Sequence, residues 1–206
     1  ARAAQRMDEM AVEMDMRTMA VSPAAAYAVA GNQTTLNGVG DVRKTAYERA
    51  NVATIANFDM YQSQNIVTHT VGPLGGTPLV NGASQNVTYA NAVGSNWSQG
   101  LITDGWTAAA ALRLNAGDVF TIAGVFAVNP VPGEGSKQAM PYLQQYTVLS
   151  DFSSSAGGAG TITISPPMIV SGPFQTVSAA PADNSVITVL GTAATGYSQN
   201  IGFHKN

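Results

Sequence analysis

The sequence predicts an α+β fold in which a helical region precedes an antiparallel β-domain. Residues 1 to about 20 are rich in Ala, Met, Glu and Arg, which favour an α-helix. From Gly72 to about Gly172, turn-forming residues recur at intervals of about ten residues and separate short runs of β-forming residues. This spacing is typical of a small barrel or sandwich, and a stretch of about 100 residues is long enough for a separate domain.

The composition limits the classes of function. The chain has 206 residues, of which only 10% are charged, against about 25% in a typical soluble protein. A soluble monomer usually carries more charge, which leaves two interpretations open: other chains cover much of this surface, or the protein is a secreted, charge-poor β-protein. The net charge of −3 gives no basic excess for phosphate backbones, so we predict no specific nucleic-acid binding.

Several kinds of site and segment are absent from the sequence, and their absence excludes further classes of protein. There is no cysteine, so disulfides and thiolate zinc sites are excluded. No apolar run is long enough to cross a membrane and no signal peptide stands at the start, so we predict no membrane partner. Because the first residue is Ala1 and not Met, we expect that a leader was removed or that the chain is a piece of a longer protein.

The first helix is expected to end at Ser22-Pro23, because the residue before a proline avoids the α conformation. Apolar residues repeat along it at helical spacing, which indicates a face in the core or in a subunit contact. This face consists of Ala3, Met7, Met10, Ala11 and Met14. The acidic residues of the helix are interpreted as a solvated face in preference to a metal or acid–base site. They are Asp8, Glu9, Glu13 and Asp15.

The next residues are expected to form a loop and a second helix. Residues 24–42 are rich in Ala, Gly, Asn and Thr, which predicts a loop. Residues 41–58 carry a stripe of small residues and begin at Asp41, a suitable N-cap, which predicts a shorter helix. Residues 66–71 then alternate in the pattern of a strand.

Seven β-like segments are predicted from the alternation of residue types. In the β-domain they are 85–90, 107–114, 119–128, 143–152 and 161–166, and after it 175–180 and 184–191. The segment 119–128 begins after a Gly-Asp turn and contains Gly124 among β-branched and aromatic residues. This pattern predicts a buried strand with a kink at the glycine.

No residue pattern indicates catalysis. His69 and His204 are isolated, no G-x-S-x-G motif is present, and both are interpreted as structural. The segment GEGSK at 133–137 lacks the spacing of a phosphate-binding loop. We therefore predict no catalytic, cofactor-binding or metal-binding residues, and no cofactor.

The two tryptophans have different sequence environments. Trp106 lies between a turn and a strand and is predicted to belong to the core. Trp97 lies in the polar segment VGSNWSQG. A tryptophan in such a place either packs in the core or anchors a partner, and the sequence leaves both open.

Several segments together resemble the major capsid (coat) proteins of short-tailed temperate phages. The entry into the inserted β-domain of that family is similar to ANFDMYQSQNIVTHTVG followed by GGTPLVNGASQNVTY. The body of the insertion is similar to AGDVFTIAGVFAVNP, LQQYTV and TITISPPMI, and the strand that returns to the main fold is similar to GYSQNIGFHKN. The Met-rich opening resembles the end of the long spine helix of the Hong Kong 97-like capsid fold.

The resemblance implies part of a Hong Kong 97-like capsid fold, with spine-helix and A-domain segments, that carries an inserted antiparallel β-barrel domain. Four parts follow from it. They are the end of the spine helix (P-domain) at 1–22, an A-domain segment at 23–72, the inserted barrel at 73–175 and a return segment at 176–206. The expected barrel core comprises Val119, Phe120, Ile122, Val125 and Phe126.

The resemblance also implies a structural protein and not an enzyme. The function would be that of a major capsid subunit, which self-assembles into the icosahedral shell that encloses the phage genome. Its partners would be other copies, in hexamers and pentamers, with scaffolding and portal proteins. It would assemble in the cytoplasm of the bacterial host and reside in the virion. The implied contact loop between subunits contains Asn91, Ser95, Asn96, Trp97 and Ser98.

Two alternatives belong to other classes of protein. A β-rich phage decoration or receptor-binding module would explain the barrel but not the Met-rich opening helix. An enzyme, such as a hydrolase, would need a nucleophile and a base that the fold brings together. His69 and His204 are the residues whose replacement would test it.

Overall fold

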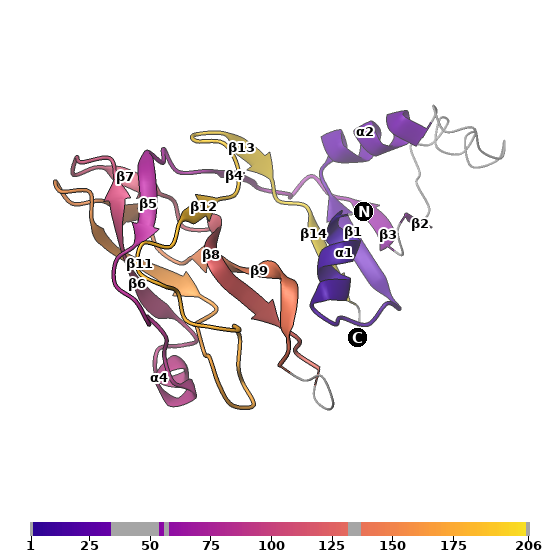
Figure 1. Cartoon of the computed structure of the whole chain (residues 1–206). Helices are drawn as coiled ribbons and strands as arrows, with labels where there is room; N and C mark the ends of the chain where they lie inside the picture. The colour runs from indigo at the N-terminus through magenta and orange to yellow at the C-terminus, as the bar shows by residue number, and fades with distance from the viewer. Residues whose placement is uncertain (1, 34–53, 56–57, 132–136, 205–206) are drawn as a thin grey trace. The chain divides into compact units, whose positions relative to one another are not determined.

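The protein is mostly β-structure with short helices (Figure 1). The computed structural model describes residues 2–33, 54–55, 58–131 and 137–204. Within these residues it contains three α-helices, none longer than 11 residues.

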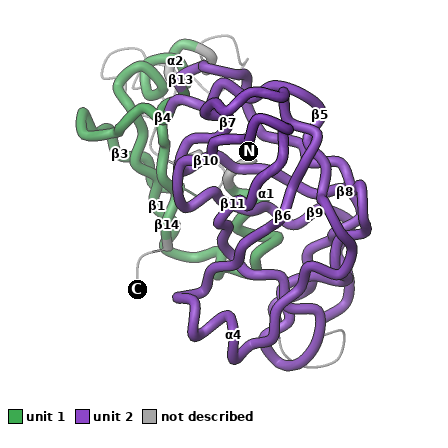
Figure 2. The backbone as a smooth tube through the Cα atoms, turned by 90° about the vertical axis from the view of Figure 1, so that its left-hand side faces the viewer, with its two compact units in different colours: residues 1–69, 197–206 green, residues 70–196 purple. Residues whose placement is uncertain are grey.

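The chain divides into two compact units, which Figure 2 shows in different colours. Unit 1 comprises residues 1–69 and 197–206, and unit 2 comprises residues 70–196. Unit 2 is therefore an insertion into the sequence of unit 1. Both of its limits lie outside the range 73–175 expected for the barrel.

Unit 1 is built on a four-stranded sheet with the order β14-β1-β3-β2. Strand β1 pairs antiparallel with β14 and parallel with β3, and Figure 1 shows the yellow C-terminal strand beside the indigo β1. The last residues of the chain therefore complete the sheet that its first strand begins. The elements are α1 (Arg2–Glu9), β1 (Arg17–Val21), α2 (Pro23–Gln33), β2 (Thr54–Ile55), β3 (Phe58–Gln62) and β14 (Ile201–His204).

The expectation of a helix through residues 1 to about 20 is wrong beyond Glu9. Arg17 is the reason, because its side chain is only 2% exposed and organises the preceding loop. Its guanidinium contacts the Asp8 carboxylate at 2.7 Å and donates to the carbonyls of Val12 at 2.6 Å and Glu13 at 2.7 Å. These contacts, with pairing of β1 on both sides, outweigh the helical propensity of the segment.

Ser22-Pro23 begins a helix instead of ending one. The Ser22 hydroxyl accepts a hydrogen bond from the N–H of Ala25 at 3.4 Å. Proline is well tolerated in the first turn of a helix, because an N–H at that position would have no partner within the helix. The loop expected at residues 24–42 is therefore wrong as far as Gln33. The helix expected at 41–58 lies mostly outside the described residues, but Thr54–Ile55 form β2.

Unit 2 contains a six-stranded antiparallel sheet with the order β12-β8-β9-β11-β6-β5. Its two edge strands meet at a bridge between Leu79 and Val186. There the N–H of Val80 donates to the carbonyl of Ser185 at 3.0 Å, so the sheet is a nearly closed barrel. The strands are β5 (Gly76–Val80), β6 (Gln99–Trp106), β8 (Val119–Val128), β9 (Ala139–Val148), β11 (Gly160–Ser165) and β12 (Ile187–Val189).

Smaller elements complete the described chain. Two further sheets have two strands each, β10 with β7 and β13 with β4. The single helix described in unit 2 is α4 (Tyr89–Gly94). The bounds of the remaining strands are β4 (Thr68–Thr70), β7 (Leu112–Leu114), β10 (Phe152–Ser153) and β13 (Gly196–Ser198).

One hydrophobic core fills the barrel. Its members come from every strand of the six-stranded sheet, and burial of each large apolar side chain stabilises the fold by about 1.5–3 kcal/mol. Trp106 belongs to it, 4% exposed, as predicted. The core consists of Val80, Leu101, Trp106, Leu114, Phe120, Ile122, Val125, Tyr146, Val148, Phe152, Ile162, Ile164, Met168, Val177 and Ile187.

Strand β8 follows the predicted range 119–128 and has a bulge at its glycine. Gly124 adopts φ 81°, and the register with β9 shifts between Thr121 and Phe126. Between these two pairs β8 advances five residues while β9 advances only two, from Gln145 to Leu143. The odd difference reverses the face that the side chains of β8 take beyond the bulge. Val125 is consequently buried, whereas Phe126 is 38% exposed.

The strands expected at 85–90 and 107–114 are mostly absent, because polar side chains take the hydrogen bonds of a strand. The Gln85 amide donates to the carbonyl of Ile102 at 3.0 Å and accepts from its N–H at 2.7 Å. The Arg113 guanidinium donates to the carbonyls of Thr107 at 3.0 Å and Ala109 at 3.4 Å. Residues 107–111 thus fold around an arginine and form no strand.

Candidate contact site around helix α4

Helix α4 presents the first residues of the predicted contact loop. Thr88 is its N-cap, with its hydroxyl accepting a hydrogen bond from the N–H of Asn91 at 3.3 Å. Ala92 is the buried residue of the helix, at 0% exposure. Asn91 and Ser95 are exposed, and so are Tyr89 and Val93, so the helix turns both polar and apolar side chains to solvent.

A strained turn follows the helix. Asn96 and Trp97 have φ of 51° and 57°, a conformation that costs roughly 1–2 kcal/mol for a bulky side chain. The Trp97 N–H donates to the carbonyl of Ala92 at 2.8 Å, and its carbonyl accepts from the Ser165 hydroxyl at 3.0 Å. These bonds hold the indole half-buried at the surface of the barrel.

Three aromatic rings gather beside this turn. Tyr89 stacks on Phe174 with 4.1 Å between ring centroids and an interplanar angle of 12°. Tyr89 also meets Trp97 edge to face, with centroids 6.1 Å apart. Tyr89 is 44% and Phe174 is 51% exposed, so the cluster forms an apolar patch that is open to solvent.

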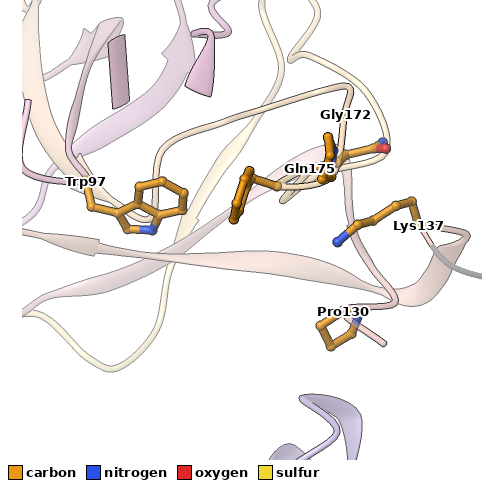
Figure 3. Close-up of a pocket in the computed structure, with 7 residues that line it drawn as sticks. Trp97, Pro130, Lys137, Gly172 and Gln175 are labelled. Carbon is orange, nitrogen blue, oxygen red and sulfur yellow. The ribbon is translucent and has the colours of Figure 1, made fainter. Parts of the chain in front are cut away.

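A pocket of about 670 Å³ opens beside the aromatic cluster. Figure 3 shows Trp97 and Lys137 at opposite ends of the residues that line it. Its walls are mostly apolar, and Lys137 and Gln175 supply the polar side chains. The lining residues are Trp97, Pro130, Lys137, Gly172, Pro173, Phe174 and Gln175.

Lys137 gives the pocket a positive charge that is rare in unit 2. Residues 70–196 contain two basic residues, Arg113 and Lys137. Arg113 is 8% exposed and binds the Ser154 hydroxyl at 3.0 Å and the carbonyl of Leu74 at 3.2 Å. Lys137 is therefore the basic residue that unit 2 offers to a partner.

The residues predicted for the barrel core and for the contact loop differ in how far they are exposed to solvent. Phe120, Ile122 and Val125 are fully buried, and Val119 is half-buried. Phe126 is not a core residue, because the Gly124 bulge turns it outward. Within the expected contact loop, Asn91, Ser95 and Asn96 are exposed, whereas Trp97 and Ser98 are half-buried.

Sequence reasoning missed three residues of this site: Tyr89, Lys137 and Phe174. The sequence predicts a strand at Tyr89, where helix α4 forms instead, and Phe174 lies far from the loop in sequence. The scarcity of basic residues in unit 2 was a signal that could have drawn attention to Lys137.

The described residues contain no group of three or more His, Cys, Asp or Glu side chains placed to hold a metal ion. His69 lies on β4 and His204 on β14. Among the residues that the structure describes, no helix has the length and apolar character needed to cross a membrane.

Comparisons with known proteins bear on what this chain is. A search of curated proteins gave no match. A solved structure described as "CUS-3 coat protein I-domain" is 26% identical, covers 58% of this chain and 98% of that chain, and has a TM-score of 0.36. The profile of the family described as "P22 coat protein - gene protein 5" matches residues 1–206, which is the whole chain. The chain therefore belongs to the P22 coat protein family and is a structural coat protein of a bacteriophage capsid.

Proposed function

We propose that this chain is part of a major capsid subunit that self-assembles into the icosahedral shell enclosing the phage genome. The observation that carries the proposal is the family match over all 206 residues. The low charge of 10% also supports it, because surfaces buried between subunits lose charged residues at their core. The role is structural, not enzymatic.

The main fold is proposed to be of the Hong Kong 97-like type with a barrel inserted into it. Support comes from the order of the units: residues 1–69 and 197–206 form one unit, and unit 2 lies between them in the sequence. Residues 23–72 are proposed as an A-domain segment and 176–206 as the return segment. In this structure residues 176–196, with strand β12, belong to unit 2. Within the proposed spine-helix segment at 1–22, the helix itself covers only Arg2–Glu9.

The proposed partners are other copies of the subunit, arranged in hexamers and pentamers, together with scaffolding and portal proteins. Assembly would take place in the host cytoplasm before the subunit becomes part of the virion. The contact loop between subunits is proposed to lie around Ala92, where three residues are exposed and two are half-buried. Its residues are Asn91, Ser95, Asn96, Trp97 and Ser98.

Sedimentation of the full coat protein, expressed with its neighbouring phage genes, tests this function. Shells sediment far faster than subunits, and we expect most of the protein in the fast fraction. The Trp97→Ala variant should shift protein toward the slow fraction, whereas Val186→Ala, at a 51% exposed position outside the site, should not. Protein found only as monomers or small oligomers would favour the decoration or receptor-binding module.

A further inference from the structure

The pocket beside α4 has the features of a site that holds a partner. Two of its lining residues, Trp97 and Lys137, have positive φ of 57° and 61° without being glycine. Strained backbone persists where surrounding bonds enforce it, and it often marks a binding site. The hydrogen bonds of the Trp97 backbone with Ala92 and Ser165 hold its aromatic ring half-buried at the pocket.

The residues that line the pocket are complementary to a partner with apolar side chains and a negative charge. Trp97 and Phe174 offer aromatic surface, and Lys137 offers the ammonium group. A segment with a carboxylate next to a flexible apolar side chain would contact both the aromatic surface and the ammonium group. Thioether sulfur also makes favourable contacts with aromatic rings, so methionine is a well-suited apolar group.

One segment of this chain has that chemistry. Residues 10–16, MAVEMDM, connect α1 to β1 and contain two carboxylates and no basic residue. Met10, Met14 and Met16 are 57%, 65% and 61% exposed. Three exposed methionines within seven residues form an apolar surface that the described fold of unit 1 leaves to solvent.

This segment is held in a defined shape before any contact is made. The buried Arg17 guanidinium donates to the carbonyls of Val12 and Glu13 within it. The Asp15 carboxylate accepts the N–H of Met16 at 2.8 Å. A loop that is already ordered loses less conformational entropy on binding.

We propose that the pocket of one copy receives the Met10–Met16 segment of a second copy, with methionine side chains against Trp97 and Phe174 and a carboxylate beside Lys137. The occupant is a second copy because both complementary surfaces belong to this chain. This inference rests on the proposed function, since it assumes that coat subunits contact one another, and it names the groups that meet.

Cysteine cross-linking between two variants tests the contact, because the chain has no cysteine of its own. One population of full coat protein carries Gln175→Cys at the pocket, and the other carries Met14→Cys in the segment. The two are mixed under assembly conditions and oxidised. The control mixture pairs Gln175→Cys with Tyr61→Cys, a position of unit 1 that is 61% exposed.

A disulfide-linked heterodimer in the test mixture, in excess over the control by on the order of tenfold, is the expected result. Adding Lys137→Glu should lower the yield about twofold to tenfold, because an ion pair at the surface contributes modestly. Adding Asp15→Lys to the other population should then restore the yield. Equal yields in test and control mixtures would overturn the inference.

Two other outcomes would also overturn it. Homodimers of Gln175→Cys alone would show that pockets face each other. A disulfide within single chains that carry both cysteines, without cross-linking in the mixture, would place the segment in its own chain's pocket. Sedimentation of the same samples separates the two proposals: shells without the expected cross-link refute this contact alone, whereas no shells at all refute the proposed function.

Discussion

The Asp118 carboxylate accepts a hydrogen bond from the backbone N–H of Gly72 at 3.0 Å, across 46 positions of sequence. The same oxygen, Oδ2, accepts the N–H of Asn115 at 2.8 Å, and Asp118 is only 1% exposed. A single buried carboxylate thus joins the first residues of unit 2 to the turn before its long strand β8.

Replacing Asp118 by alanine should destabilise the protein by about 2–4 kcal/mol, because two backbone donors lose their acceptor. Asp118→Asn keeps one oxygen acceptor and should cost less. The control is Asp151→Ala, at an exposed residue that accepts one hydrogen bond from the N–H of Ala116. Urea denaturation measures all three, and an equal loss for Asp118→Ala and Asp151→Ala would show that the buried carboxylate has no special role.

Gly124→Ala should lower the free energy of unfolding by roughly 1 kcal/mol through backbone strain alone. The glycine has φ 81°, and a Cβ at this position would have no atom within 4 Å. Gly124→Asn should cost less, because asparagine tolerates positive φ better than alanine. In Gly94→Ala, where a Cβ is equally unhindered, the change should be neutral or stabilising; equal losses at both glycines would contradict the bulge.

Neighbouring positions on β8 should respond oppositely to a charge. Val125→Asp places a carboxylate without a partner in the core, where Val125 is fully buried, and should prevent folding. Phe126→Asp should give soluble, folded protein because that side chain is 38% exposed. Circular dichroism and two-dimensional NMR of the purified variants decide this, and a folded Val125→Asp protein would contradict the assigned core.

Tyr146 should make the protein sensitive to alkaline pH. Its hydroxyl is buried without a hydrogen-bond partner among the described residues, and burial raises its pKa. Above about pH 10 the unfolded chain ionises while the folded tyrosine stays protonated, so stability should fall by about 1.4 kcal/mol per pH unit. This part of the loss should be absent in Tyr146→Phe.

The same variant has a second expected effect at neutral pH. Because Tyr146→Phe removes a buried hydroxyl that has no partner in the described structure, its stability at pH 7 should equal or exceed that of the wild type. Urea denaturation at pH 7 and at pH 11 compares the two proteins. A clear loss of stability at pH 7 would show that the hydroxyl makes a favourable contact.

Strand β8 shows how far the sequence could predict the fold. Its ends were predictable because turn residues bound a run rich in β-formers, and Gly124 within this run indicated the kink. The outward turn of Phe126 was not predictable, because the register shift that causes it depends on pairing with β9. The face that a side chain takes beyond a bulge is therefore decided by strand pairing within the sheet.

Nonlocal contacts explain the failures elsewhere. The segment after Glu9 has helical propensity, yet the burial of Arg17 and the pairing of β1 with β3 and β14 decide its structure. The pocket was equally hidden from sequence reasoning, because Trp97, Lys137 and Phe174 come from three separate segments. Only the barrel brings these side chains together.

Electron microscopy of the full coat protein, purified after expression with its neighbouring phage genes, tests the role of this chain most directly. We predict closed icosahedral shells of uniform size, with one barrel-shaped density for each subunit. Images that contain only monomers or small oligomers, under conditions where the protein is folded, would show that it does not build the shell.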